Sequence, residues 1–271
     1  MIAVSDYRLF TDEVCGDGMQ AKVIKAVNIL TGKSYVAKVT RLCTARQIEL
    51  FENELEILKR LCDCDYAVRV VESFYLKDMG ILILEEMPFD LMTLIEKGAL
   101  KLEEYLEIFK QVCLAVKELH SRNVVHLDIK PENILVSADY KTVRICDFGC
   151  SKITNHRGFV SSSVGTLMYC SPEGLSCTSH FDGKKADIWS LGILYHVLIT
   201  QRWPFATTTD EQVKCLIMNA ELTYHRGLAE HQIKLLNKMT HLDPTKRCDI
   251  TYLCSSQKRR LSWRNLLRIL R

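Results

Sequence analysis

One stretch of the chain places polar side chains at fixed offsets around a short apolar strand, and this stretch constrains the fold most. It begins at His126, reads His-Leu-Asp-Ile-Lys-Pro-Glu-Asn, continues through two short apolar runs and ends in Asp-Phe-Gly. The runs 134–136 and 143–146 predict a hairpin that brings Asn133 and Asp147 close together. A carboxylate and an amide oxygen side by side are hard ligands that suit magnesium. Taken alone, an Asp-Phe-Gly is commonly a turn and an Asp-x-Lys commonly lies on the surface.

Length and composition are those of an ordinary globular protein. The 271 residues favour one large domain or two closely joined lobes. The net charge of +3 is too small to indicate nucleic acid or membrane as a partner. The start of the chain has no long apolar run, so no signal peptide is expected, and the twelve cysteines are expected to be reduced thiols. The longest apolar segment, 188–199, is too short to span a bilayer and fits a buried helix.

The N-terminal part of the chain reads as strands and hairpins. Short apolar runs alternate with glycines and polar turns from Tyr7 to Lys38. Segment 15–23 reads Cys-Gly-Asp-Gly-Met-Gln-Ala-Lys-Val. Its glycines allow backbone amides to close over phosphates, although two glycines alone commonly mark only a hairpin turn. Lys38 lies inside an apolar strand, 35–39, and a buried lysine needs an anionic partner.

A helix is predicted next, over 49–61, with an apolar stripe formed by Leu50, Leu55, Leu58 and Leu61. It carries three candidates for that partner, namely Glu52, Glu54 and Glu56. After Asp90 the pattern changes from strand to helix periodicity. Two further strands and one long helix are expected over 68–74, 80–84 and 102–119.

These segments together resemble the eukaryotic protein kinase family. The stretch from His126 is similar to the H-R-D-x-K-x-x-N catalytic loop and the D-F-G magnesium loop, and 15–23 is similar to G-x-G-x-x-G-x-V. The resemblance extends from Cys15 to Arg247. It implies an α+β, bilobal fold in a single kinase domain over 1–271. The smaller lobe, about 1–87, would be mainly antiparallel β with one main helix, and the larger lobe, about 88–271, mainly α-helical.

The resemblance also implies a catalytic group and a magnesium site. Asp128 would be the catalytic base or would orient the acceptor hydroxyl. Lys130 would steady the γ-phosphate of ATP. Asn133 and Asp147 would hold Mg²⁺.

The nucleotide phosphates would be held by the glycine-rich turn and by the buried lysine. Cys15, Gly16 and Gly18 belong to the turn in this resemblance. Lys38 would contact the α- and β-phosphates and pair with a glutamate of the following helix. Glu54 is in the register of the family's pairing glutamate, and Glu52 is the alternative.

The adenine would lie near the connection between the lobes. The resemblance implies that backbone groups there bind the base, that one side chain guards a back pocket, and that three apolar side chains sandwich the ring. The backbone groups would be those of Glu85 and Met87, and Leu84 would guard the back pocket. The ring would lie between Val23, Ala37 and Leu135.

The later motifs favour serine/threonine substrates and a protein acceptor. The pair Gly165-Thr166 is similar to the Gly-Thr of serine/threonine kinases, whose threonine bonds the catalytic aspartate and lysine. Ser171-Pro172-Glu173 resembles the family's A-P-E and disfavours a small-molecule kinase. By resemblance, Asp187 holds the backbone of the catalytic loop, and Arg247 forms a buried ion pair with Glu173.

Leu127 is the main departure, because most of the family has arginine there. That arginine pairs with a phosphorylated residue of the activation segment, which by resemblance follows Asp147 and ends at Glu173. Because leucine cannot form this pair, we expect activity without phosphorylation of Ser161, Ser162 or Ser163. His-Leu-Asp is locally similar to Mos-type kinases. Together with Ala21 in place of the third glycine, Leu127 leaves a pseudokinase scaffold as the alternative function. A monomeric catalytic domain, intracellular in the cytoplasm or nucleus and without a transmembrane segment, is expected.

Overall fold

The computed structural model describes residues 1–17, 21–154, 158–160, 165–176, 180–205 and 209–255. The chain divides into two compact units. Unit 1 contains Met1–Pro88 together with Cys146–Gly149, and unit 2 contains Phe89–Ile145 and the described residues from Cys150 onward. Unit 1 is mainly a β-sheet and unit 2 is mainly helical, which is the expected α+β, bilobal class. The extent of a single domain over 1–271 stays a prediction.

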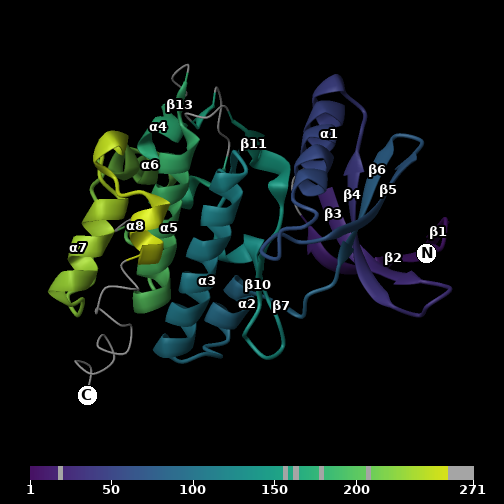
Figure 1. Ribbon diagram of the computed structural model, residues 1–271, viewed down its shortest axis with the longest axis horizontal. Coiled ribbons are helices and arrows are strands. Elements are labelled where there is room, and N and C mark those ends of the chain that lie inside the picture. The colour runs from purple at the N-terminus through teal and green to yellow at the C-terminus, as the bar shows by residue number, and fades with distance from the viewer. Residues whose placement is uncertain (18–20, 155–157, 161–164, 177–179, 206–208, 256–271) are drawn as a thin grey trace. The chain divides into compact units, whose positions relative to one another are not determined.

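Unit 1 is built on a six-stranded antiparallel sheet of order β1-β2-β3-β4-β6-β5. One helix, α1, packs on β4 and β5 (Figure 1). The elements are β1 (Ile2–Val4), β2 (Tyr7–Asp17), β3 (Ala21–Asn28), β4 (Ser34–Arg41), α1 (Ala45–Arg60), β5 (Val70–Leu76) and β6 (Met79–Glu85).

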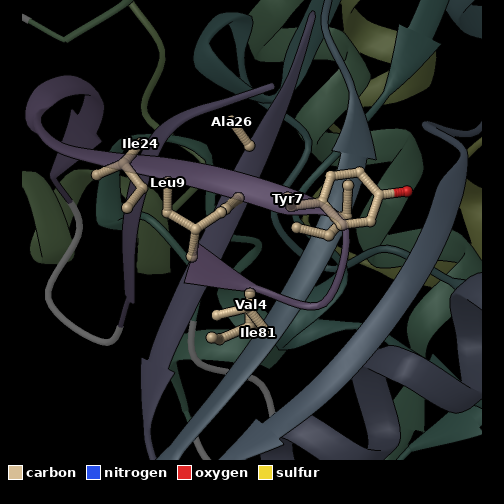
Figure 2. Close-up of a cluster of buried hydrophobic side chains, with 8 residues drawn as sticks. Val4, Tyr7, Leu9, Ile24, Ala26 and Ile81 are labelled. Atoms are coloured by element: carbon tan, nitrogen blue, oxygen red, sulfur yellow. The ribbon is translucent and has the colours of Figure 1, made fainter. Parts of the chain in front are cut away.

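Alternation of side chains along the strands creates the core of this sheet. On β3, Ile24 and Ala26 are buried, whereas their neighbours are only half-buried, as expected for successive side chains on opposite faces. Figure 2 shows side chains of this cluster, with Leu9 between Ile24 and Tyr7, and Ile81 next to Val4. The same cluster includes Val4, Ala37 and Ile83.

Helix α1 begins earlier than the sequence pattern indicates, because Thr44 forms a capping box with Gln47. The Thr44 hydroxyl accepts from the Gln47 backbone N–H at 3.2 Å, and the Gln47 side chain accepts from the Thr44 backbone N–H at 3.0 Å. These two bonds satisfy donors that a helix start leaves unpaired. The expected leucine stripe needs one correction: Leu50 is only half-buried, and Phe51 takes the buried position.

Unit 2 is organised around two long helices, α3 (Leu102–Ser121) and α5 (Gly183–Thr200), which pack on each other. Helix α5 is buried on all sides over most of its length, which explains its mostly apolar sequence from Ile188 to Ile199. The other helices are α2 (Leu91–Glu96), α4 (Pro172–Leu175), α6 (Asp210–Met218), α7 (Glu230–Met239) and α8 (Ile250–Ser255). Short 3-10 helices are η1 (Pro131–Asn133), η2 (Phe148–Cys150), η3 (Leu167–Tyr169) and η4 (Pro244–Lys246).

Small antiparallel pairs complete unit 2. The predicted hairpin forms between β9 and β10, with Ile134 opposite Ile145, and β7 extends it. The strands are β7 (Phe89–Asp90), β8 (Val124–Val125), β9 (Ile134–Val136), β10 (Val143–Ile145), β11 (Lys152–Ile153), β12 (Phe159–Val160) and β13 (Phe181–Asp182). In the described part of the chain, no helix has both the length and the apolar composition needed to cross a membrane.

Gly80 allows α1 to approach the sheet closely. A Cβ atom at this position would lie 2.6 Å from the nearest ring atom of Phe51, which is itself 1% exposed. We expect Gly80→Ala to lower the free energy of unfolding by about 1–3 kcal/mol through overpacking, as measured by urea denaturation. Combining it with Phe51→Leu is expected to cost less than the sum of the two single changes. Additive losses would show that the ring is not the obstacle.

Candidate active site

Unit 1 holds a buried lysine between two carboxylates. Lys38 lies on β4, and its Nζ is 2.6 Å from Glu54 Oε1 on α1 and 2.7 Å from Asp147 Oδ1. The lysine side chain is 11% exposed. Burial alone lowers the pKa of Lys38, but the two carboxylates outweigh burial and hold that pKa well above its ordinary value. Lys38 is therefore a fixed cation, and the structure places Glu54 rather than the exposed Glu52 beside it.

The glycine-rich turn is described only in part. Gly16 lies on β2 opposite Val23, and a bulge interrupts the pairing just before it. Cys15 is exposed. Gly18 lies outside the described residues.

Ala37 requires a correction. It is fully buried in the core cluster with Ile24 and Ile83, on the face of β4 opposite to Lys38, because adjacent strand residues point to opposite faces. It is therefore not placed to contact a nucleotide that Lys38 contacts. Val36, which the sequence analysis did not name, is also on the opposite face from Ala37 and so shares the face of Lys38. Counting two residues back from Lys38 along the strand would have found it.

Other residues expected near the adenine occupy strand positions. In unit 1, Leu84 is buried on β6 opposite Val36, and Val23 lies opposite Lys38 on the neighbouring strand. The backbone N–H of Glu85 donates to Arg69 O at 3.1 Å, so this N–H is already engaged within unit 1. Met87, also in unit 1, is half-buried. In unit 2, Leu135 is half-buried on β9.

Unit 2 joins the predicted catalytic residues in one hydrogen-bond network. Asp128 is 6% exposed, and its Oδ1 accepts from the Thr166 backbone N–H at 2.7 Å. Lys130 Nζ lies 2.7 Å from the Thr166 hydroxyl and 3.1 Å from Asp128 Oδ2. Asn133 Nδ2 donates to the backbone carbonyl of Asp128 at 2.8 Å and to its Oδ2 at 3.0 Å. The arrangement holds one carboxylate in place with three separate donors.

Asp187 on α5 holds the start of this loop. Its carboxylate is fully buried and accepts from the backbone N–H groups of His126 at 3.0 Å and Leu127 at 2.8 Å. His120 Nε2 lies 2.8 Å from the same carboxylate. Leu127 has a positive φ of 64°, a conformation that is costly for a branched residue unless the surroundings impose it. The Asp187 bonds supply that constraint.

Gly165 is needed where the activation segment meets this loop. A Cβ atom there would lie 2.4 Å from the carbonyl oxygen of Leu127 and 3.3 Å from Asp128 Oδ1. The carbonyl oxygen of Leu127 is a backbone atom, so it cannot move away from a Cβ atom as the end of a flexible side chain could. Glycine at 165 therefore lets Thr166 reach both Asp128 and Lys130.

The side chain of Leu127 packs in an apolar cluster. Val160 and Phe181, which are paired on β12 and β13, pack there with Val125 and Ala186. Val160 follows the D-F-G motif, so the cluster ties the activation segment to the catalytic loop. Its five described members are all apolar. Ser161, Ser162 and Ser163 lie outside the described residues.

The oxygen donors of the expected magnesium site fit that ion. Asn133 uses its amide hydrogens on Asp128, which leaves its amide oxygen for a cation. Asp147 offers a carboxylate that is 46% exposed. Among the described residues, no group of three or more His, Cys, Asp or Glu side chains could hold a metal ion. Mg²⁺ commonly takes one or two protein oxygens and completes its shell with water and phosphate.

Comparison with known proteins agrees with this geometry. The model of the protein kinase domain family matches residues 10–257. The chain belongs to the protein kinase domain family.

Curated relatives include three named serine/threonine-protein kinases. The chain is 32% identical over 245 residues to probable serine/threonine-protein kinase MARK-B of Dictyostelium discoideum, covering 87% of this chain and 34% of the relative. It is 34% identical over 252 residues to serine/threonine-protein kinase cds1 of Schizosaccharomyces pombe, covering 86% and 54%. It is 31% identical over 256 residues to human serine/threonine-protein kinase D2, covering 90% and 28%. The kinase domain thus spans about half or less of the length of these relatives.

A buried ion pair anchors the end of the activation segment. Arg247 is fully buried, and its two Nη atoms lie 2.6 and 2.7 Å from the Glu173 carboxylate. The remaining Arg247 donors reach backbone carbonyls such as that of His241 at 2.8 Å. The pairing was expected from the resemblance.

Removing one partner of this pair should leave a buried charge. We expect Glu173→Ala to lower the free energy of unfolding by about 3–5 kcal/mol, measured by urea denaturation. Glu230→Ala is the matched control, because the Glu230–Lys234 pair is exposed and such pairs contribute about 0–1 kcal/mol. Equal losses in the two variants would contradict the burial argument.

Proposed function

We propose that this kinase domain transfers the γ-phosphoryl group of ATP to serine or threonine hydroxyls of protein substrates. The observation that carries the proposal is the network in which Thr166 bonds both Asp128 and Lys130. Phosphoryl transfer depends on positioning and charge neutralisation more than on covalent chemistry. A carboxylate held at a fixed point, with a lysine 3.1 Å away, provides that positioning. The curated relatives, all named serine/threonine-protein kinases, support the same acceptor class.

Each proposed catalytic residue has a distinct part. Asp128 orients the acceptor hydroxyl and accepts its proton at a carboxylate oxygen. Lys130 offsets negative charge on the γ-phosphate. Lys38, a permanent cation beside Glu54, binds the α- and β-phosphates.

Asn133 and Asp147 are the proposed Mg²⁺ ligands. Magnesium, when bound, neutralises charge on the phosphate oxygens. The amide and carboxylate oxygens described above suit a hard cation. In the proposed nucleotide site, Val36 takes the place that the sequence analysis gave to Ala37. The other residues proposed to contact the nucleotide are unchanged: Cys15, Gly16, Gly18, Val23, Leu84, Glu85, Met87 and Leu135.

Asp128→Asn tests the proposal directly. Purified protein is incubated with magnesium, γ-labelled ATP and casein, and incorporation is counted. We expect Asp128→Asn to lower turnover roughly 10²- to 10⁴-fold, because the proton acceptor is lost. Lys38→Met should lower it roughly 10²-fold or more, because charge stabilisation of the phosphates is lost.

Asp139→Asn is the matched control for Asp128→Asn. Asp139 lies in the exposed turn of the β9–β10 hairpin, where it accepts from the Ser137 hydroxyl at 2.6 Å. The turnover of the Asp139→Asn variant should match that of the unchanged protein. Equal labelling by the unchanged protein and by the Asp128 and Lys38 variants would reject catalysis and favour the pseudokinase scaffold.

We further propose that activity does not require phosphorylation of the activation segment. Leu127 carries no cation that could pair with a phosphate, and apolar packing with Val160 and Phe181 takes its place. If the domain is active as proposed, treatment with a phosphatase should change turnover by less than twofold.

Serine-to-alanine variants complete this test. Ser161→Ala, Ser162→Ala and Ser163→Ala should retain full turnover before and after phosphatase treatment. A large loss on phosphatase treatment that disappears in one of these variants would contradict the proposal, because it would locate an activating phosphate.

Leu127→Ala should lower the free energy of unfolding by about 2–5 kcal/mol, because it leaves a cavity in a buried cluster.

A further inference from the structure

Unit 2 contains a polar pocket that the proposed catalytic residues do not use. It lies where the start of α5, the end of α7, η4 and α8 come together, and its volume is 320 Å³. Helices α5, α7 and α8 belong to the green-to-yellow part of unit 2 in Figure 1. Four cationic side chains line the pocket, namely Lys185, Lys238, Lys246 and Arg247, and Asp249 is its acidic side chain.

Two of the four cations have acidic partners and serve the fold. Arg247 is fully buried and forms the bidentate pair with Glu173. Lys185 Nζ contacts the Asp249 carboxylate and donates to the backbone carbonyl of Arg247 at 2.8 Å. Since Asp249 neutralises Lys185 and Glu173 neutralises Arg247, these groups add no net charge to the pocket.

The other two cations have no acidic partner within the described part of the chain. Lys238 Nζ lies 3.0 Å from the hydroxyl of Tyr252 and 4.4 Å from the centroid of its ring. A neutral phenol holds this lysine without cancelling its charge. Lys246 is exposed.

Asp243 is an alternative acidic partner to consider for Lys246, because the charge of Lys246 acts on its carboxylate. The pKa of Asp243 is lowered first by hydrogen bonds from Thr245, and the charge of Lys246 is a smaller cause. The Asp243 carboxylate accepts from the Thr245 backbone N–H at 2.9 Å and from its hydroxyl at 2.7 Å. This carboxylate caps η4 instead of closing an ion pair, so the pocket keeps about two positive charges.

The size and charge of the pocket select the class of occupant. A volume of 320 Å³ is at the lower end for ligand sites, and it has room for a phosphorylated side chain. Two uncompensated lysines match the charge of one phosphate monoester, about −1.5 to −2 at neutral pH. A nucleic acid would need a longer row of cations to hold successive phosphates.

We propose that this pocket binds a phosphorylated serine or threonine side chain of a partner protein, with Lys238 and Lys246 contacting the phosphate. Lysine is a common phosphate ligand because its ammonium group is a compact point charge. Tyr252 adds a hydroxyl beside Lys238. Binding at this pocket is independent of phosphoryl transfer by this chain.

The test is fluorescence anisotropy with the full chain and a labelled peptide library that has one fixed phosphoserine. The same library with serine in that place is the matched ligand. We expect phosphate-dependent binding that weakens at least tenfold in the double variant Lys238→Gln, Lys246→Gln. Lys234→Gln, one turn earlier on α7 and paired with Glu230 at 2.7 Å, should bind within twofold of the unchanged protein.

Competition experiments and stability measurements complete the test. Inorganic phosphate should compete at least tenfold more weakly than the phosphopeptide; equal competition would overturn the peptide as occupant. Equal binding of the serine library, or full binding by the double variant, would overturn the site. The thermal midpoint of each variant is measured, and Lys246→Gln alone serves if the double variant does not fold.

Asp128→Asn should bind the phosphopeptide as the unchanged protein does. An inactive unchanged protein that still binds the phosphopeptide would reject the proposed function and support the site. An active protein without phosphate-dependent binding would reject the site alone.

Discussion

The carboxylate of Asp187 is the constraint on which the catalytic loop depends. It is fully buried, and it accepts two successive backbone N–H groups, those of His126 and Leu127. A buried carboxylate is costly unless its oxygens are bonded, so α5 and the loop hold each other in place. Asp128 follows directly, and its orientation comes from this anchoring together with the bonds from Thr166 and Asn133.

The same loop shows how an apolar contact replaces an ionic one. Leucine at 127 keeps the backbone conformation of the loop, with a positive φ of 64°, while its side chain joins Val160 and Phe181. Apolar burial acts at any phosphorylation state and is not screened by salt. A charged lock would act only when the phosphate is present. The alternative function, a scaffold without catalysis, draws no support from this packing, because Asp128 and its partners remain joined beside it.

Sequence patterns predicted element types well and fine register poorly. The buried helix around Trp189 was recognisable because its apolar run is longer than a strand and shorter than a membrane span. The start of α1 was missed because a capping box, formed by Thr44 and Gln47, lies before the first apolar residue. Ala37 was expected beside the adenine because a small apolar side chain suits either face of a strand, whereas β4 places it in the core, on the face opposite to Lys38. A shift of one residue reverses the face of a strand.

The sequence by itself determined the chemical identity of the site: which acids, amides and lysines are present, and in what order along the chain. It also indicated that Lys38 needs an anionic partner, because a lysine in an apolar strand is costly to bury. The resemblance favoured Glu54 and left Glu52 as the alternative; only the tertiary structure decided between them, since the choice depends on which side of α1 faces β4. Likewise, the charge of the pocket between α7 and α8 follows from which lysines find carboxylates. The positions of these side chains in the folded chain decide that pairing, and their order in the sequence does not.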